Sequence, residues 1–461
     1  MILTVFRVLL AHSIPAVIGV IFLSWLEGGK GKLGGLEKVV LGFALGSGLI
    51  SFYMFYLGLL RIPFTLGRVS AIFWPFGILG ILLGAKRGLG SLLHFSRPSL
   101  FRGLGRTGKC LLVLISVLLI CKIIFIGFIV LNVPTYFDDS VSIWNYKAKV
   151  YYYRQGIVPD KNDPDLLGGY NPHYPNGVPL FKCWVSIWAG EWTESAVNLN
   201  TFMIFLCLGL LFYYNLKHYL PDLPAYAVTY LLLSVPLLTF HSGFAHFDLW
   251  VGFYFLAGTM YLYRWMKEKV KFHFILSALL IAVGLSVKRE TAAFFIWGLM
   301  PTLIIYQIAG REKLFTIIKQ TALYLFVALV PNLPWYVAIG VYKLQVGLYE
   351  GAMRLEFHPE AFNLLANRFF SSGNYGILWI IFFAILIITL PAVLKSSLKY
   401  LLLLVGLSLA ASLSIFIITP FFEWLRVGTT INRAMLGVIP VMVYYSALAC
   451  QKLVQHPDKP K

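Results

Sequence analysis

The chain has 461 residues, of which 59% are hydrophobic, 16% aromatic and only 12% charged, and its mean hydropathy is +0.79. A soluble globular protein contains about 25% charged residues and cannot bury this much apolar surface, so soluble, disordered and disulfide-rich classes are excluded. The formal net charge of +19 lies in short clusters at the ends of apolar runs, which indicates membrane topology and anionic lipid rather than nucleic acid as a partner.

Long apolar runs predict an all-α polytopic membrane protein with about 13 transmembrane helices. The basic loop 86–109 contains no acidic residue, and the positive-inside rule places it in the cytoplasm. Loops 132–194 and 340–373 then lie on the outer face, together with Arg61 and Arg68, which are exceptions to the rule. The predicted spans lie near residues 4–26, 39–60, 68–85, 110–131, 195–216, 225–241, 247–265, 274–288, 291–309, 315–338, 374–393, 400–420 and 433–450.

Three segments follow from this pattern. Residues 1–109 contain the N-terminal spans and the basic cytoplasmic loop. Residues 110–338 form a membrane core with the external loop 132–194, and residues 339–461 contain the external loop 340–373, the C-terminal spans and a short cytoplasmic tail. Neither internal repeats nor broken helices are visible in the sequence.

The outer loops are predicted to contain helices that lie in the membrane interface. In 142–155, helical spacing places one set of apolar side chains on a single face, which is typical of such a helix. A second helix is expected from Pro359 to Phe370, either interfacial or packed on protein. The face of the first consists of Trp144, Ala148, Tyr151 and Tyr152.

Ionisable and polar residues at the outer ends of the spans are the candidates for chemistry, because such groups are costly at membrane depth unless they are paired or used. Each also has a structural interpretation, as a helix N-cap, an interfacial anchor or a salt bridge. They are Asp138 and Asp139 after the fourth span, His173 and Tyr174 in the same loop, His246 and Asp248 at the seventh span, Lys288, Arg289 and Glu290 after the eighth, and Arg433 at the thirteenth.

These residues together resemble the GT-C superfamily of integral membrane glycosyltransferases, which use polyprenyl-phosphate-linked sugars. The resemblance covers roughly 135–433. It rests on an acidic residue in the first large outer loop, Trp144 followed by Lys147-Ala148-Lys149, the segment His173-Tyr174-Pro175, Asp248 at the start of a span, and Lys288 with Glu290 after a glycine-containing span. The lipid A aminoarabinose transferases and protein O-mannosyltransferases are of this type.

The resemblance implies that Asp139 is the catalytic carboxylate, with Asp138 as the alternative, and that Asp248 is a second acidic position. Lys288, Glu290 and Arg433 are implied as donor-site residues. Arg289 is a further phosphate-binding candidate, while His173, Tyr174, His246, Asp248 and Lys147 are candidates for binding the acceptor or the sugar.

The chemistry fits these residue types. A polyprenyl phosphate leaves as an anion that needs no proton, so the reaction requires one carboxylate base for the acceptor hydroxyl and cations for the phosphate. Attack opposite the leaving group inverts the anomeric centre. A divalent cation bridging Asp139 and Asp248 would also suit two carboxylates, and the cofactor is left open.

We therefore expect an inverting glycosyltransferase that moves a sugar to a lipid, glycan or protein acceptor. The expected location is a bacterial or archaeal plasma membrane, with the active site on the external or periplasmic side. A transporter or flippase of lipid-linked or anionic substrates is one alternative, although repeats and broken helices typical of transporters are not seen. A polysaccharide polymerase or ligase is the other, and it would not need an essential Asp.

Overall fold

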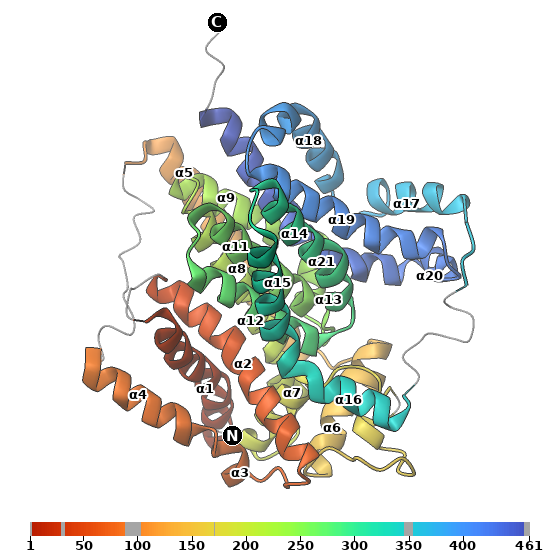
Figure 1. The fold of residues 1–461 in the computed structure, drawn as a ribbon. Coiled ribbons are helices and arrows are strands. Elements are labelled where there is room, and N and C mark those ends of the chain that lie inside the picture. Colours follow the sequence, from red (N-terminus) through yellow and green to blue (C-terminus); the bar gives the residue numbers. More distant parts are fainter. Residues whose placement is uncertain (1, 29–32, 88–102, 170, 345–353, 456–461) are drawn as a thin grey trace, which may run out of the picture. The chain divides into compact units, whose positions relative to one another are not determined.

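The computed structural model describes residues 2–28, 33–87, 103–169, 171–344 and 354–455, and every element in these ranges is a helix (Figure 1). The all-α fold class is therefore confirmed for the described part of the chain. Two basic residues of the loop 86–109, Arg97 and Arg102, and part of the loop 340–373 lie outside the described residues.

Nine of the described helices are long and apolar enough to cross a bilayer, or up to ten if one bent pair is counted as a single span. These helices indicate an integral membrane protein with several spans. Three of the thirteen predicted spans correspond to helices that do not reach this standard: α12 (Lys271–Val287) and α18 (Leu378–Leu394) have 17 residues each, and α11 (Asp248–Glu268) is long enough but not apolar enough. The number 13 thus stays a prediction.

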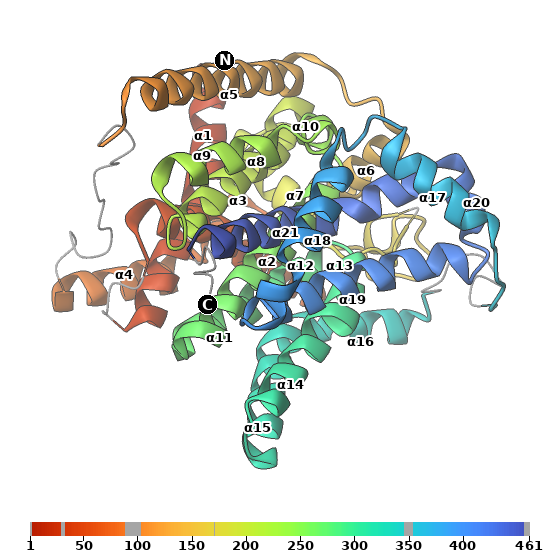
Figure 2. The same cartoon turned by 90° about the horizontal axis from the view of Figure 1, so that it is seen from above.

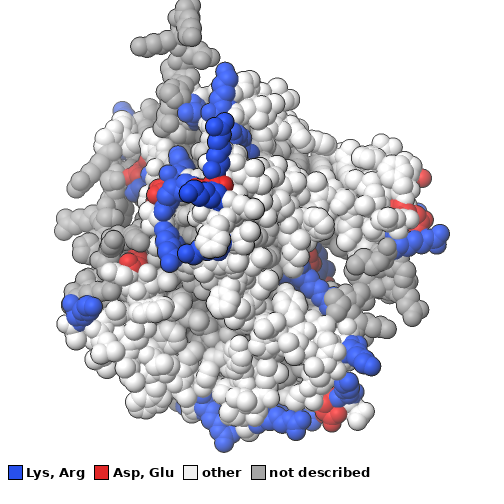
Figure 3. All heavy atoms as spheres, viewed as in Figure 1, with Lys and Arg blue, Asp and Glu red and all other residues white. Residues whose placement is uncertain are grey.

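The chain divides into two compact units, each assembled from separate stretches of sequence. Unit 1 consists of 1–214, 242–247 and 334–344, and unit 2 of 215–241, 248–333 and 345–461. The three segments predicted from the sequence describe roles rather than compact units and stay a prediction. On the face drawn in Figure 3, small groups of charged side chains are separated by wide uncharged areas, as contact with lipid requires.

Unit 1 is built on the antiparallel pair α1 and α2, which lie side by side (Figure 1). A Cβ atom at Gly19 would lie within bonding distance of the Gly42 carbonyl, so the two backbones approach as closely as small residues permit. Its helices are α1 (Ile2–Glu27), α2 (Gly35–Leu59), α3 (Leu66–Ser70), α4 (Phe73–Arg87), α5 (Arg106–Asn132), η2 (Ser140–Asn145), α6 (Tyr146–Tyr153), η3 (Leu166–Gly168), α7 (Gly177–Ala189), most of α8 (Glu194–Leu216) and most of α16 (Leu333–Tyr342).

Unit 2 is organised around α11, in which every residue from Asp248 to Met266 is buried. It packs between α12 and α21, and α14 and α15 run beside each other (Figures 1 and 2). The other helices of this unit are α9 (Asp222–Leu233), α10 (Pro236–Ser242), α13 (Glu290–Ala293), η4 (Phe294–Leu299), α14 (Met300–Ala309), α15 (Leu314–Leu329), η5 (Val330–Asn332), α17 (Glu360–Phe370), α19 (Leu398–Ile417), α20 (Phe422–Val427) and α21 (Thr429–Gln455).

The predicted span 225–241 is a broken helix, contrary to the expectation that none would occur. Helices α9 and α10 meet at an angle of 71°. Pro236 has no N–H and disfavours helical geometry in the residue before it, which accounts for the break. Just beyond the break, the N–H of Leu237 donates to the carbonyl of Asn374 at 3.0 Å.

Both helices predicted in the outer loops are present, but the first does not expose its apolar face. Trp144, Ala148 and Tyr151 are completely buried, and the helix that carries two of them, α6, packs on α7. Protein therefore covers the face that the pattern assigned to the membrane surface, because helical periodicity identifies an apolar face and not what covers it. In α17, Leu365 and Phe369 are buried while Phe362 is exposed.

Candidate functional site

The acidic loop follows directly after α5, a candidate span, and leads into a π-helical segment. Asp138 is exposed and Asp139 is half-buried. Asp139 already has helical backbone angles, and its side chain makes no capping hydrogen bond. The N-cap interpretation of Asp139 is thus not realised. The next six residues form η2, a π-helix, a geometry that is rare and often found at functional sites.

A chain of polar contacts fixes the backbone just before this loop. The N–H of Thr135 donates to Glu194 Oε2 at 3.1 Å, and Asn198 Nδ2 donates to Thr135 Oγ1 at 2.8 Å. Asn145 Nδ2 donates to the same hydroxyl oxygen at 3.3 Å. Residues from α8 and η2 thereby hold Thr135, and the acidic pair is only a few residues further along the chain.

Lys182 completes this network from α7, and sequence reasoning missed it. Its Nζ donates to Asn145 Oδ1 at 2.6 Å and to Asn198 Oδ1 at 3.1 Å, and it lies 5.4 Å from the centroid of the Phe247 ring. The side chain is fully buried, and this desolvation lowers the pKa of Lys182 to about 7, with a smaller opposing effect of Glu194. The only sequence signal was a single Lys inside an apolar stretch.

Aromatic rings enclose the loop. The Trp144 ring lies 4.9 Å from that of Tyr174 and 4.5 Å from that of Phe247. His246, which is buried, lies 5.4 Å from Phe137, and half-buried His173 lies 4.7 Å from Tyr174. His173 and Tyr174 thus lie with Trp144, and His246 lies with Phe137. His246 precedes Phe247 directly in the chain, and we call these two neighbouring groups of rings the aromatic cluster of unit 1.

Lys147 is placed as an anchor for this loop. It is buried, and its Nζ donates to the carbonyls of Tyr174 at 2.6 Å and Asn171 at 3.3 Å. Its Nζ also lies 5.6 Å from the centroid of the Trp335 ring. These contacts secure the backbone that carries His173 and Tyr174, and sugar binding by Lys147 itself stays a prediction.

A second cluster lies in unit 2 and joins three predicted residues from separate elements. Asp248 is buried at the first position of α11. Lys288 Nζ donates to its Oδ1 at 2.6 Å, and Arg433 Nε from α21 donates to its Oδ2 at 3.3 Å. Each carboxylate oxygen therefore contacts one cation.

Further groups surround this ion cluster. Lys288 also pairs with Glu290 Oε1 at 2.7 Å, and His241 Nδ1 lies 3.9 Å from Asp248 Oδ2. Glu290 is 40% exposed and Arg433 is 22% exposed, whereas Lys288 and His241 are buried. The outer rim of the cluster is thus open and its centre is not. Arg289, which is half-buried, follows Lys288 directly.

Local sequence explains how the cluster forms. Lys288 has extended backbone geometry at the end of α12, where the helix dipole favours a cation, and Glu290 opens α13, where it favours an anion. One turn after Asp248, a Cβ atom at Gly252 would meet the Leu436 carbonyl of α21. Only glycine permits this approach of α21, which brings Arg433 to Asp248.

Metal binding finds no support in the described ranges: they contain no group of three or more His, Cys, Asp or Glu side chains arranged to hold an ion. The loop of unit 1 carries the half-buried carboxylate of Asp139, and the ion cluster of unit 2 holds two cations on Asp248. Comparisons with protein-family models, curated proteins and solved structures find no match to this chain.

Proposed function

We propose that this protein is an inverting glycosyltransferase that takes a sugar from a polyprenyl-phosphate donor on the non-cytoplasmic face of a membrane. The observation that carries the proposal is the placement of Lys288 and Arg433 on the two oxygens of buried Asp248. A leaving phosphate needs fixed N–H donors in a site with little water. Asp248 then positions the cations, and the acceptor is a lipid, glycan or protein.

Asp139 acts as the base in this proposal. Its carboxylate takes the proton of the acceptor hydroxyl while the oxygen attacks the anomeric carbon, and the bond to phosphate breaks with both electrons on the phosphate oxygen. Half-burial of Asp139, in contrast to the exposed Asp138, supports this choice between the two neighbours. Of the aromatic cluster, the half-buried rings of His173 and Tyr174 are the ones on which a sugar would stack.

The test is transfer of radiolabelled sugar from a mixed pool of polyprenyl-phosphate sugars to membrane lipid and protein, at matched expression. Asp139→Asn is expected to reduce transfer by about 100-fold or more, the usual contribution of a general base. Asp138→Asn is the matched control and is expected to retain transfer. Equal rates for Asp139→Asn and the wild type would contradict the proposal, and would favour a polymerase or ligase without an essential Asp.

The proposal also requires that both clusters act on one substrate, which a double-mutant cycle measures. Asp139→Asn and Lys288→Met are expected to be strongly non-additive, because residues that serve one transition state do not contribute independently. Additive losses would show that the two clusters serve separate processes.

One observation favours a transporter or flippase as a second candidate. The break between α9 and α10 is the kind of interruption that many transporters use near their substrate site, and His241 of α10 lies beside Asp248. Reconstitution into vesicles with a lipid-linked sugar in one leaflet separates the candidates: movement of intact donor across the bilayer without transfer would establish transport.

A further inference from the structure

A cleft of about 730 Å³ lies in unit 1, apart from the aromatic cluster. Three stretches of chain form it: the end of α2 with the loop after it, the loop that follows α6, and the end of α16. The lining residues are Gly58, Arg61, Ile62, Pro63, Arg154, Gln155, Gly156, Ile157, Pro159, Asp160, Lys161 and Tyr342.

The shape of the cleft is fixed by its backbone. Arg61 and Gln155 both have left-handed φ angles, of 56° and 50°, just after the ends of α2 and α6, where glycine is the usual residue. The N–H of Phe64 donates to the Gln155 carbonyl at 2.7 Å and so joins the two loops. Ile157 packs so closely on Gly58 that a Cβ there would lie 2.5 Å from its side chain.

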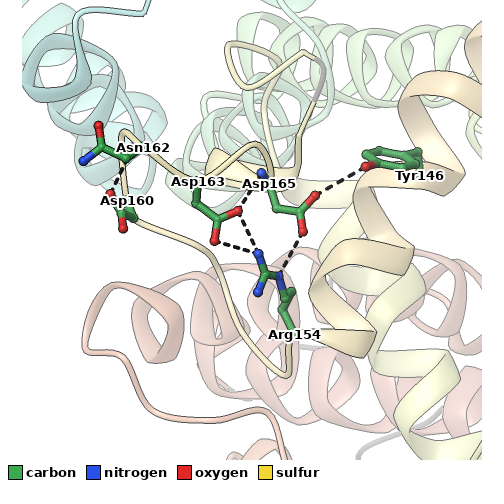
Figure 4. Close-up of polar contacts among 6 residues, drawn as sticks. All are labelled: Tyr146, Arg154, Asp160, Asn162, Asp163 and Asp165. Atoms are coloured by element: carbon green, nitrogen blue, oxygen red, sulfur yellow. Dashed lines mark hydrogen bonds and ion pairs between the residues drawn. The ribbon is translucent and has the colours of Figure 1, made fainter.

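The cleft is cationic. Arg61, Arg154 and Lys161 line it, against the single carboxylate of Asp160. Arg154 is held between Asp163 and Asp165, at 2.6 and 2.9 Å, through Nη2 and Nε (Figure 4). These two acids more than balance its charge and fix its position, so Arg154 itself adds no attraction for an anion.

The other two cations are not neutralised in this way. No ion pair joins Arg61 to another described residue. Among the described residues, Lys161 contacts the ring of Tyr342, whose centroid lies 6.0 Å from its Nζ. Arg61 and Lys161 therefore give the cleft its attraction for an anion.

Two candidate membrane spans end at this cleft. The span Gly35–Leu59 ends two residues before Arg61, and the span Leu314–Tyr342 ends at Tyr342 itself. Leu60 and Val341, beside these ends, are 70% and 61% exposed. A cationic cleft where spans end, bordered by exposed apolar side chains, lies at the depth of the lipid headgroups.

We propose that this cleft binds the negatively charged phosphate of a membrane lipid headgroup, with Arg61 and Lys161 as the cations that recognise it. The site would also account for an exception in the predicted topology, in which Arg61 is placed on the outer face, where the positive-inside rule disfavours it. An arginine that binds a lipid phosphate would be retained on the outer face for that binding, regardless of its effect on topology. The site is independent of the proposed transfer reaction, and its test measures binding alone.

The experiment uses the purified full chain in detergent and native mass spectrometry with added phosphatidic acid or phosphatidylcholine. The wild type is expected to retain phosphatidic acid in preference to phosphatidylcholine. Arg61→Gln and Lys161→Gln are each expected to weaken retention of phosphatidic acid about tenfold, as loss of one charge-assisted hydrogen bond would. Arg68→Gln is the matched control, because Arg68 is an exposed outer cation that does not line the cleft, and it is expected to have less than a twofold effect.

Two results would overturn the proposal. If Arg68→Gln weakens binding as much as Arg61→Gln, the effect is general surface charge and not this cleft. If glycerol 3-phosphate, which carries the same phosphate without the acyl chains, displaces phosphatidic acid at equal concentration, the ligand is a soluble phosphate and not a membrane lipid. Unchanged elution of each variant in gel filtration shows that the chain is folded.

Discussion

The buried amine of Lys182 makes the stability of the protein depend on pH in a defined direction. Burial lowers its pKa to about 7 in the folded protein, whereas an unfolded Lys has a pKa of about 10.4. Between these values the unfolded chain binds one more proton than the folded protein, so the free energy of unfolding rises with pH. The full difference corresponds to about 5 kcal/mol, and the part gained between pH 7 and pH 9 is about 2 kcal/mol.

Lys182→Met removes the titrating group and keeps the length of the side chain. The variant loses the hydrogen bonds to Asn145 and Asn198, but this cost is nearly the same at both pH values. The difference in unfolding free energy between wild type and variant is therefore expected to increase by about 2 kcal/mol from pH 7 to pH 9, in favour of the wild type.

The assay is unfolding by sodium dodecyl sulfate in mixed micelles, followed by tryptophan fluorescence at both pH values. Comparison with the variant cancels other groups that titrate in this range, such as the thiol of Cys183, whose pKa burial raises. Lys109→Met, in the same unit but exposed and outside the cationic cleft, is the control and should behave as the wild type. A rise with pH that persists in Lys182→Met would refute the reasoning, as would a wild type with no rise.

Two further predictions concern the ion cluster of unit 2. Asp248→Asn leaves Lys288 and Arg433 without their carboxylate and is expected to lower the unfolding free energy by about 3–5 kcal/mol. The double variant Asp248→Leu/Lys288→Met should recover part of that loss of stability without recovering sugar transfer. An Asp248→Asn variant as stable as the wild type would contradict the buried ion pair. Gly252→Leu places a side chain against the Leu436 carbonyl and is expected to abolish sugar transfer by moving Arg433 away from Asp248. Gly406→Leu, at a position with open space around it, is the control. Normal sugar transfer by Gly252→Leu would show that the close approach of α21 to α11 is not needed.

The helices could be predicted from the sequence because hydrophobic length is a local property. Each of the thirteen predicted spans corresponds to helix in the structure, including those too short or not apolar enough to qualify as spans. The break at Pro236 was readable from that residue, but hydropathy averaged over a window hides a single proline. The covering of the Trp144 face was not readable, because it depends on α7, which is distant in the sequence.

Some residues of the candidate site could likewise be predicted from the sequence, and one could not. Asp248, Lys288 and Arg433 were identified because an ionisable group at a helix end needs a partner, and the structure supplies each with one of the others. Lys182 was missed because its partners, Asn145 and Asn198, are 37 and 16 residues away and carry no charge. A charge satisfied by neutral amides leaves no complementary charge pattern in the sequence.

The π-helical segments η2 and η4 favour a functional role over simple anchoring for Asp139 and Glu290. One begins at Ser140, directly after Asp139, and the other begins at Phe294, one turn after Glu290. A π-helix is less stable than an α-helix of the same sequence and is kept where it serves a purpose. Salt bridges and interfacial anchors need no such geometry, since ordinary helix ends provide them. The first segment adjoins the proposed base, and the second follows the residue that pairs with Lys288. Their positions are therefore an argument for the proposed transferase that does not depend on the contacts of Asp248.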